Sequence, residues 1–159
     1  MKIRLLAIGK IKEKYLKEGI NEYLIRLKPY AQIEIVEVND ESIRDKATLS
    51  DIEIAKNKEG QRILKLLKPT DYLIALDLHQ KQFKSPEFAE FLEQKLVEGG
   101  SSVNFVIGGS YGLSDDLKKR ANASFSLSNM TFLHQMTRLI LLEQIYRAFK
   151  INNNETYHK

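Results

Sequence analysis

The amino-acid sequence predicts an α/β fold in which a mainly parallel sheet is covered by helices on both faces. Short apolar segments alternate with amphipathic ones along all 159 residues, in the order βαβαβαβαβα. Two of the apolar segments, 72–78 and 103–107, are nearly continuous hydrophobic runs, which is typical of strands buried on both faces. No internal repeat or flexible linker interrupts the pattern, so we expect one domain over residues 1–159.

The predicted strands are short runs rich in apolar and β-branched residues, and turn residues bound them. They cover residues 2–8, 32–38, 72–78, 103–107 and 124–128. The first ends at Gly9, and the second alternates apolar with polar residues, so we expect it to be half-exposed. The third and fourth are apolar enough to lie inside the sheet, and the fifth, SFSLS, is the weakest of the set.

The predicted helices carry apolar residues at three- and four-residue spacing, and most have a recognisable start or stop signal. They cover residues 12–28, about 50–67, a segment from 85 onward, a short segment after 114, and 134–150. Pro29 ends the first. Ser50 with Glu53 forms a capping-box sequence for the second, after a polar loop. Pro86 is expected at the first position of the third, and Ser114 caps the fourth.

Composition excludes several classes of protein. The chain is 43% hydrophobic and 29% charged, and no apolar run approaches the roughly 18 residues that span a membrane. With no cysteine there can be no disulfide, thiol nucleophile or cysteine-bound zinc, and the three histidines show no ligand spacing. We therefore expect a cytoplasmic, metal-free protein. The net charge of +4 permits RNA binding without requiring it.

Ligands of open α/β sheets bind beyond the carboxyl ends of the central strands, and three predicted loops lie there. They are the end of strand 72–78, the glycines at 108–112, and residues 127–133. The second loop, VIGGSYGL, has the spacing G-G-x-x-G instead of the dinucleotide fingerprint G-x-G-x-x-G, with no acid at the expected distance. No lysine follows Gly112, as a phosphate-binding loop would need. Both phosphate interpretations are weak, and the glycines could simply turn the chain.

The third loop, LSNMTF at residues 127–132, precedes the last long helix. Its backbone groups could bind an adenine edge, and Leu127, Met130 and Phe132 could form an apolar wall. Alternatively, Asn129 or Thr131 caps the helix that follows. Two such loops after neighbouring strands would form one cleft of backbone groups without a lysine or arginine clamp. Such a cleft suits a ligand that lacks phosphates.

Several long segments of the chain are similar to one known family. They are MKIRLLAIGKIKEKY, KEGQRIL, VIGGSYGL, LSNMTFLHQMTRLILLEQIYRAFKI and the terminal YHK. Together they resemble the SPOUT-class methyltransferases, and within that class the ribosomal RNA large subunit methyltransferase H family, which methylates N3 of a pseudouridine in 23S ribosomal RNA. The resemblance covers nearly the whole chain.

This resemblance implies a C-terminal deep trefoil knot, a rare exception to the rule that chains avoid knots. It implies S-adenosylmethionine as cofactor, a homodimer whose active sites share residues, and the assembled ribosome as substrate. The cofactor contacts carried over by matching motif are Leu76, Gly108, Leu127, Ser128, Asn129, Met130, Thr131 and Phe132.

The expected reaction requires a general base or strong stabilisation of the developing anion, because N3 of a uracil ring is a poor nucleophile until it loses its proton. The resemblance points to Arg147, Tyr157 and His158 as catalytic residues, with the tail reaching the active site of the dimer. Tyr157 and His158 would position or deprotonate the base, and Arg147 would support the charge. Alternatively, Arg147 forms a helix ion pair with Glu143, and the terminal residues are frayed and idle.

Other polar residues carry weaker expectations. His134 is expected to cap or pack the last helix rather than to act as a base, and His79 to be solvated or near the cleft rim. Arg138 is a candidate for a phosphate contact. Two other functions stay open: a regulatory domain that binds ATP or NAD at the glycine loop, and a non-enzymatic ribosome-associated protein.

Overall fold

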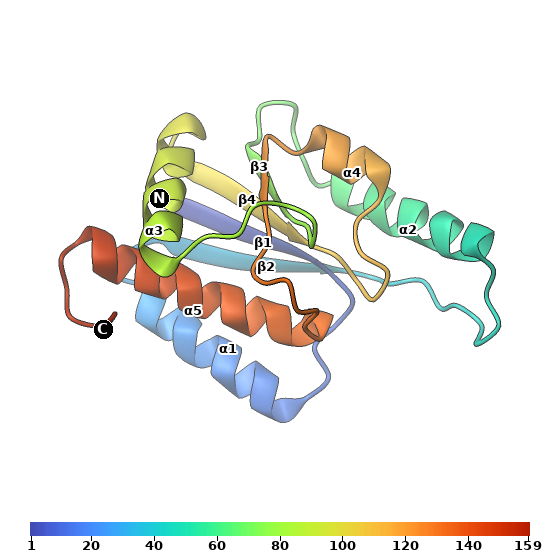
Figure 1. Cartoon of the computed structure of the whole chain (residues 1–159), viewed down its shortest axis with the longest axis horizontal. Coiled ribbons are helices and arrows are strands. Elements are labelled where there is room, and N and C mark those ends of the chain that lie inside the picture. Colours follow the sequence, from blue (N-terminus) through green and yellow to red (C-terminus); the bar gives the residue numbers. More distant parts are fainter.

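A computed structural model describes all residues 1–159 and confirms the predicted order of elements. Its five strands are β1 (Lys2–Ile8), β2 (Gln32–Val38), β3 (Leu73–Leu76), β4 (Ser102–Ile107) and β5 (Ala123–Phe125). They form one sheet in the order β2-β1-β4-β3-β5, and every neighbouring pair is parallel. The mainly parallel sheet that the sequence predicts is therefore entirely parallel (Figure 1).

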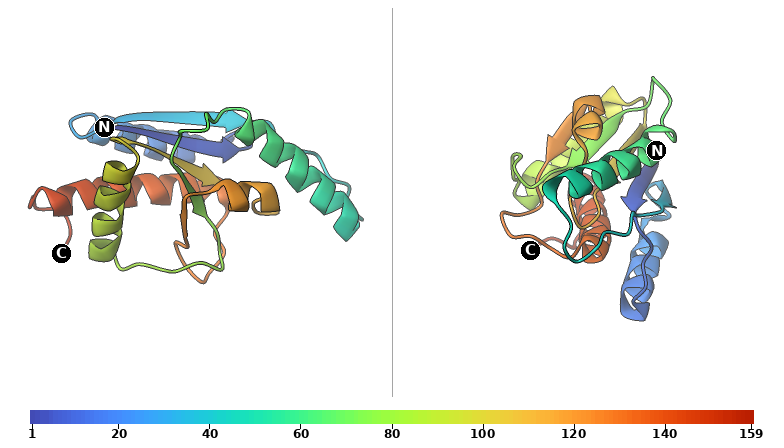
Figure 2. Two further views of the ribbon diagram at one scale, coloured as in Figure 1. Left: turned by 90° about the horizontal axis from the view of Figure 1, so that it is seen from above. Right: turned by 90° about the vertical axis from the view of Figure 1, so that its right-hand side faces the viewer.

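Five helices cover the two faces of this sheet, as predicted. They are α1 (Lys14–Leu27), α2 (Leu49–Leu64), α3 (Ser85–Glu98), α4 (Asp115–Arg120) and α5 (His134–Asn152). Helices α1, α3 and α5 pack on one face, and α2 and α4 pack on the other (Figures 1 and 2). None of the helices is both long and apolar enough to cross a lipid bilayer.

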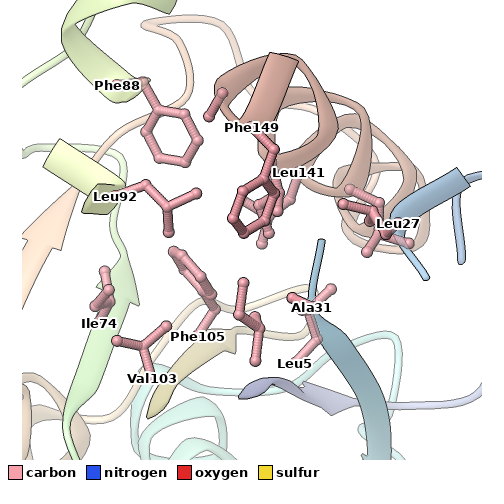
Figure 3. Packing of buried hydrophobic residues seen from close by; sticks show 14 of the residues in the cluster. Leu5, Leu27, Ala31, Ile74, Phe88, Leu92, Val103, Phe105, Leu141 and Phe149 are labelled. Atoms are coloured by element: carbon pink, nitrogen blue, oxygen red, sulfur yellow. The ribbon is translucent and has the colours of Figure 1, made fainter. Parts of the chain in front are cut away.

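Two hydrophobic cores hold these layers together, because successive side chains of a strand point to opposite faces. Leu5 of β1 and Phe105 of β4 face the larger core, which α1, α3 and α5 cover (Figure 3). Their chain neighbours Leu6 and Val106 face the smaller core under α2 and α4. The central strands are thus buried on both sides, which explains their continuous apolar sequences.

The start of α2 differs from the predicted one. The hydroxyl of Thr48 accepts a hydrogen bond from the Asp51 N–H at 3.1 Å, and the Asp51 carboxylate accepts one from the Thr48 N–H at 3.0 Å. The capping box is therefore Thr48 with Asp51, and the predicted pair of Ser50 and Glu53 is wrong. Both sequences satisfy the same spacing, but the cap lies two residues earlier, at Thr48, so the helix starts at Leu49 and Ser50 lies inside its first turn.

Two other boundaries are shifted. Pro86 is the second residue of α3 instead of the first, since Ser85 already lies in the helix. Strand β5 is shorter than the predicted 124–128 because it pairs only with β3, at the edge of the sheet, and the chain leaves the sheet after Phe125. Leu127 and Ser128 consequently lie in the segment that leads toward α5.

The segments that leave β3 and β5 run against each other. The Asp77 N–H donates to the Phe125 carbonyl at 3.0 Å, and the Ser126 N–H donates to the Lys81 carbonyl at 2.9 Å. Gln82 and Ser126 form an isolated parallel bridge. Two connections that are far apart in sequence are thus joined at the carboxyl edge of the sheet (Figure 1).

Candidate functional site

A cavity of about 660 Å³ opens at the carboxyl ends of β3, β4 and β5. This volume lies within the range of small-molecule sites, roughly 300–1,000 Å³. Most of the lining comes from the three loops that the sequence predicts: residues 76–79, 107–113 and 126–132. The remainder comes from α2, α4 and the start of α5. The convergence follows from the topology, since parallel strands end at one edge of the sheet.

Seven of the eight predicted cofactor contacts line this cavity. They are Leu76, Gly108, Leu127, Ser128, Met130, Thr131 and Phe132. The eighth, Asn129, is absent from the lining, and its side-chain oxygen accepts a hydrogen bond from the Gln82 amide at 2.5 Å. Neither Asn129 nor Thr131 caps α5, whose N-cap residue is Leu133 and has no side-chain cap bond.

The glycine loop is a tight turn closed by a hydrogen bond from the Gly112 N–H to the Gly109 carbonyl at 3.1 Å. Gly112 has a φ of 84°, a conformation that residues with side chains rarely adopt. Gly108 is constrained differently: a Cβ atom there would lie 2.8 Å from the carbonyl carbon of Gly112. All three glycines line the cavity, so the turn brings bare backbone to its wall.

The backbone of these loops offers many free hydrogen-bond donors. The N–H groups of Gly108, Ser110 and Tyr111 donate to no acceptor within the chain, and Gly109 pairs with Gly112 in an isolated antiparallel bridge. Among residues 127–133 only the Met130 N–H is bonded, to the Ser128 hydroxyl at 3.0 Å. Backbone N–H groups need a partner in protein, ligand or water. The cavity can therefore bind a ligand through main-chain groups, as the sequence predicts.

The sequence predicts a cleft without a lysine or arginine clamp, and two lysines line the cavity, each beside a carboxylate. Lys56 of α2 and Lys118 of α4 both line the cavity. The Lys118 ammonium lies 3.8 Å from the Asp77 carboxylate, and that of Lys56 lies 3.4 Å from Glu53. The sequences of the three loops could not reveal these lysines, because the lysine side chains reach the cavity from helices α2 and α4.

His134, the first residue of α5, also lines the cavity, and its imidazole forms no hydrogen bond within the chain. It does not cap the helix, so the capping interpretation is wrong. Burial lowers the pKa of His134, as does the nearby Arg138, while Asp40 acts in the opposite direction. The imidazole is therefore neutral at pH 7. His79 lies exposed at the rim, as expected.

Arg138 is a structural residue, and the prediction of a phosphate contact is wrong. Its side chain is only 1% exposed. The guanidinium donates to the Glu37 carboxylate at 2.5 Å and to the carbonyls of Ile8 and Gly9 at 3.1 and 2.7 Å. It thereby ties α5 to the carboxyl ends of β1 and β2, and fixes the wall of the cavity that carries His134.

Glu59 of α2 was not identified from the sequence. It is 2% exposed, and one carboxylate oxygen accepts the Glu41 N–H at 2.9 Å while the other has no partner. Burial raises the pKa of this carboxyl. The unpaired oxygen lies 3.7 Å from the position that a Cβ of Gly109 would occupy, directly behind the glycine loop. The next residue, Gly60, allows α2 to approach Ser114 closely.

The three predicted catalytic residues lie together, but not in the cavity. Arg147 donates to the ring nitrogen Nδ1 of His158 at 3.1 Å, and its guanidinium lies 4.8 Å from the centre of the Tyr157 ring. The predicted ion pair of Arg147 with Glu143 also forms, and Glu143 accepts the Tyr157 hydroxyl at 3.1 Å. The tail is thus docked on α5. Arg147 follows Thr137, a cavity residue, by ten positions, about 15 Å along the helix.

A ligand cavity built from loop backbone at the carboxyl edge of a parallel sheet defines an α/β ligand-binding protein. A family model described as "Predicted SPOUT methyltransferase" matches residues 1–158. The chain is 51% identical over 159 residues to the ribosomal RNA large subunit methyltransferase H of Carboxydothermus hydrogenoformans, and 48% identical to that of Clostridium acetobutylicum. Each alignment covers 100% of both chains. The chain therefore belongs to the SPOUT methyltransferase family, in the branch that contains these proteins, as its motifs predict.

Two solved structures share the fold. One is a Legionella pneumophila protein described as a methyltransferase and solved with bound SAM, with a TM-score of 0.50 and 13% identity. The other is a methylase family protein from Haemophilus influenzae, with a TM-score of 0.51 and 16% identity. The matches cover 94% and 96% of this chain, which spans 66% of the length of each.

Proposed function

We propose that this chain uses S-adenosylmethionine to methylate N3 of a pseudouridine in 23S ribosomal RNA, with the assembled ribosome as substrate. The observation that carries the proposal is the end-to-end match to relatives of equal length that bear the name ribosomal RNA large subunit methyltransferase H. The proposal places the protein in the cytoplasm, since its substrate is the ribosome. It also treats residues 1–159 as one catalytic domain.

The cavity fits the proposed cofactor in both chemistry and size. The free N–H groups of the glycine loop and of residues 127–133 suit the polar edges of the adenosine and methionine parts. Leu76, Leu127 and Phe132 provide apolar walls for the adenine ring. When bound, S-adenosylmethionine supplies an electrophilic methyl group, and the electron pair of its broken carbon–sulfur bond stays on sulfur. The chain's task is then mainly to position the reactants.

Arg147, Tyr157 and His158 are proposed to act on the target base. Glu143 holds both the Arg147 guanidinium and the Tyr157 hydroxyl, so the three side chains have a defined arrangement. Arg147 would stabilise the negative charge that develops on the uracil ring as its N3 proton leaves. Tyr157 and His158 would orient the ring by stacking and hydrogen bonding.

A homodimer is part of the proposal, because in one chain these residues lie about 15 Å along α5 from the cavity wall. A partner subunit would bring its own tail to the cavity. Exposed apolar side chains surround the cavity mouth, and they are those of Leu78, Tyr111, Met130 and Leu133. Met130 is 73% exposed. Clustered apolar surface of this kind typically marks an interaction site.

The trefoil knot belongs to the same proposal. It requires the segment after β5 to pass through the loop that follows β3. The hydrogen bonds of Asp77 with Phe125 and of Ser126 with Lys81 support this arrangement, since they hold the two segments side by side. The knot would hold the loop at residues 127–132 in the curved form that lines the cavity.

The test of the activity uses ribosomes that contain or lack the pseudouridine. Incubation with cofactor labelled in its methyl group should transfer label only to the first kind, and nucleoside mass spectrometry should locate it on N3. Calorimetry with S-adenosylmethionine, S-adenosylhomocysteine, ATP and NAD separates this function from that of a nucleotide-binding regulatory domain. Tight ATP or NAD binding, or no label on intact ribosomes, would overturn the proposal.

Truncation after Glu155 tests the role of the tail. Removing residues 156–159 deletes Tyr157 and His158 but leaves the bonds of Glu155 to Tyr30 and Lys150 in place. Methylation should be lost while the affinity for S-adenosylmethionine, measured by calorimetry, stays within about twofold. Removal of Lys159 alone is the matched control and should preserve activity. A fully active truncated enzyme would show that the tail is idle.

A further inference from the structure

The proposed reaction needs a group that accepts the N3 proton, and the phenol of Tyr157 does not suit this task. Its hydroxyl donates to Glu143 and lies 3.1 Å from the Tyr23 hydroxyl. Burial raises the pKa of Tyr157, and Tyr23 and Glu143 raise it further. The phenol therefore stays protonated at neutral pH, and it acts as a hydrogen-bond donor.

His158 is also arranged as a donor. A guanidinium has only N–H groups and no acceptor, so the contact between Arg147 and Nδ1 of His158 requires Nδ1 to accept. The neutral imidazole then carries its proton on Nε2, the nitrogen that remains free. Arg147 itself is a cation. All three residues can thus stabilise a developing anion, but none offers a free basic lone pair.

The cavity contains one half-buried side chain with such a lone pair. His134 lies in the wall formed by the start of α5, and neither ring nitrogen bonds to a protein group. Nε2 lies 3.8 Å from the point where a side chain on Gly9 would begin. The charged groups acting on it are Arg138, from the next turn of α5, and Asp40, from the segment after β2. The carboxylate that lines the same cavity, that of Asp77, is paired with Lys118.

We propose that His134 is the general base of the reaction and accepts the N3 proton in the same chain whose loops hold the cofactor. The N3–H bond breaks, its proton moves to a ring nitrogen of His134, and the electron pair left on N3 forms the bond to the methyl group. The imidazole becomes an imidazolium, so charge balances when the positive sulfonium becomes a neutral thioether. The proposal rests on the proposed function and adds a residue to it.

Arg138 and Gly9 explain why this histidine is available. Arg138 holds the first turn of α5 against the carboxyl end of β1, which fixes the imidazole without bonding to it. Gly9 has no side chain to fill the space beside Nε2. A nearby cation and partial burial both favour the neutral ring, which is the form that can accept a proton.

The test combines a pH profile with chemical rescue. Single-turnover methylation by the full-length enzyme should fall on the acid side of an apparent pKa below the ordinary histidine value of 6.5. His134→Gln should reduce the rate about 10²- to 10⁴-fold and remove that acid limb. Free imidazole should restore activity to His134→Ala. Calorimetry should show an S-adenosylmethionine affinity within about threefold of the wild type for both variants.

Comparison variants separate this inference from a structural role and from the activity itself. His158→Gln should lower the rate but keep the acid limb, and His79→Gln should keep it too. In the protein without cofactor, the NMR signal of the His134 ring should titrate below pH 6.5, assigned by its loss in His134→Gln. An active wild type whose His134→Gln variant keeps the acid limb, or a His134→Ala variant that imidazole does not rescue, would overturn the assignment while leaving the methyltransferase proposal intact.

Discussion

At the scale of single residues, the cavity depends more on the absence of side chains than on their presence. Gly108 and Gly112 each exclude a side chain for a different reason, a close backbone approach and a positive φ. The resulting turn leaves the N–H groups of Gly108, Ser110 and Tyr111 free to bind a ligand. This explains why a glycine loop without the spacing of either phosphate-binding motif can still form a ligand site.

These two reasons predict different consequences of adding a methyl group. In Gly108→Ala the new Cβ meets the Gly112 backbone, which cannot move aside as a flexible side chain would. The turn must open, so we expect S-adenosylmethionine to bind at least about tenfold more weakly by calorimetry. In Gly112→Ala the added Cβ has free space, and the cost is about 1–2 kcal/mol of unfolding free energy from the strained φ, measured by urea denaturation. Equal cofactor affinity in Gly108→Ala and the wild type would contradict this account.

Sequence reasoning located the loop residues of the site but missed side chains that come from helices. The three loops could be located, because residues that follow parallel strands must meet at one edge of the sheet. Leu76 and Gly108 themselves were indicated by the resemblance to the family. Lys56 and Glu59 lie in the middle of α2, and their positions depend on how that helix is rotated and packed. The local pattern of a helix indicates which face is buried, but not which loop that face approaches.

At the scale of elements, hydrophobic patterns together with proline and capping residues placed every strand and helix, but they did not fix the ends of these elements. The ends depend on single hydrogen bonds that compete between neighbouring residues. Two overlapping capping sequences precede α2, and only the pair of Thr48 and Asp51 forms the reciprocal bonds. The hydroxyl of Ser50 makes no hydrogen bond within the chain, since it lies inside the first turn.

Two substitutions distinguish these capping sequences. Thr48→Ala removes the acceptor for the Asp51 N–H and should lower the free energy of unfolding by about 1 kcal/mol. Ser50→Ala, the matched control two residues later, should not lower it measurably. Urea denaturation followed by circular dichroism measures both. If Ser50→Ala were the more destabilising change, the helix would begin where the sequence pattern alone placed it.

At the scale of the whole molecule, the strand order could not be predicted from local patterns. The order β2-β1-β4-β3-β5 depends on which connections cross the sheet, and the sequence of one strand does not specify its neighbours. This order puts β3, β4 and β5 side by side, so that their three loops form one cavity. It also leaves α5 with a cavity residue, His134, near its start and the Arg147 cluster near its end.

This separation along α5 predicts that a complete active site takes its cavity from one chain and its tail from the other. Gly108→Trp would block the cavity, and truncation after Glu155 would remove the tail, so each variant alone should be inactive. When equal amounts of the two are unfolded and refolded together, half of the dimers are mixed, and each contains one intact cavity that faces one intact tail. Such a mixture should recover about one quarter of the wild-type rate on ribosomes, because one site in two is active in half of the dimers. If each site instead used its own chain's tail, the mixed dimers would contain no complete site, and the mixture would stay inactive. Refolded wild type sets the reference rate, and light scattering of the mixture confirms that dimers have formed.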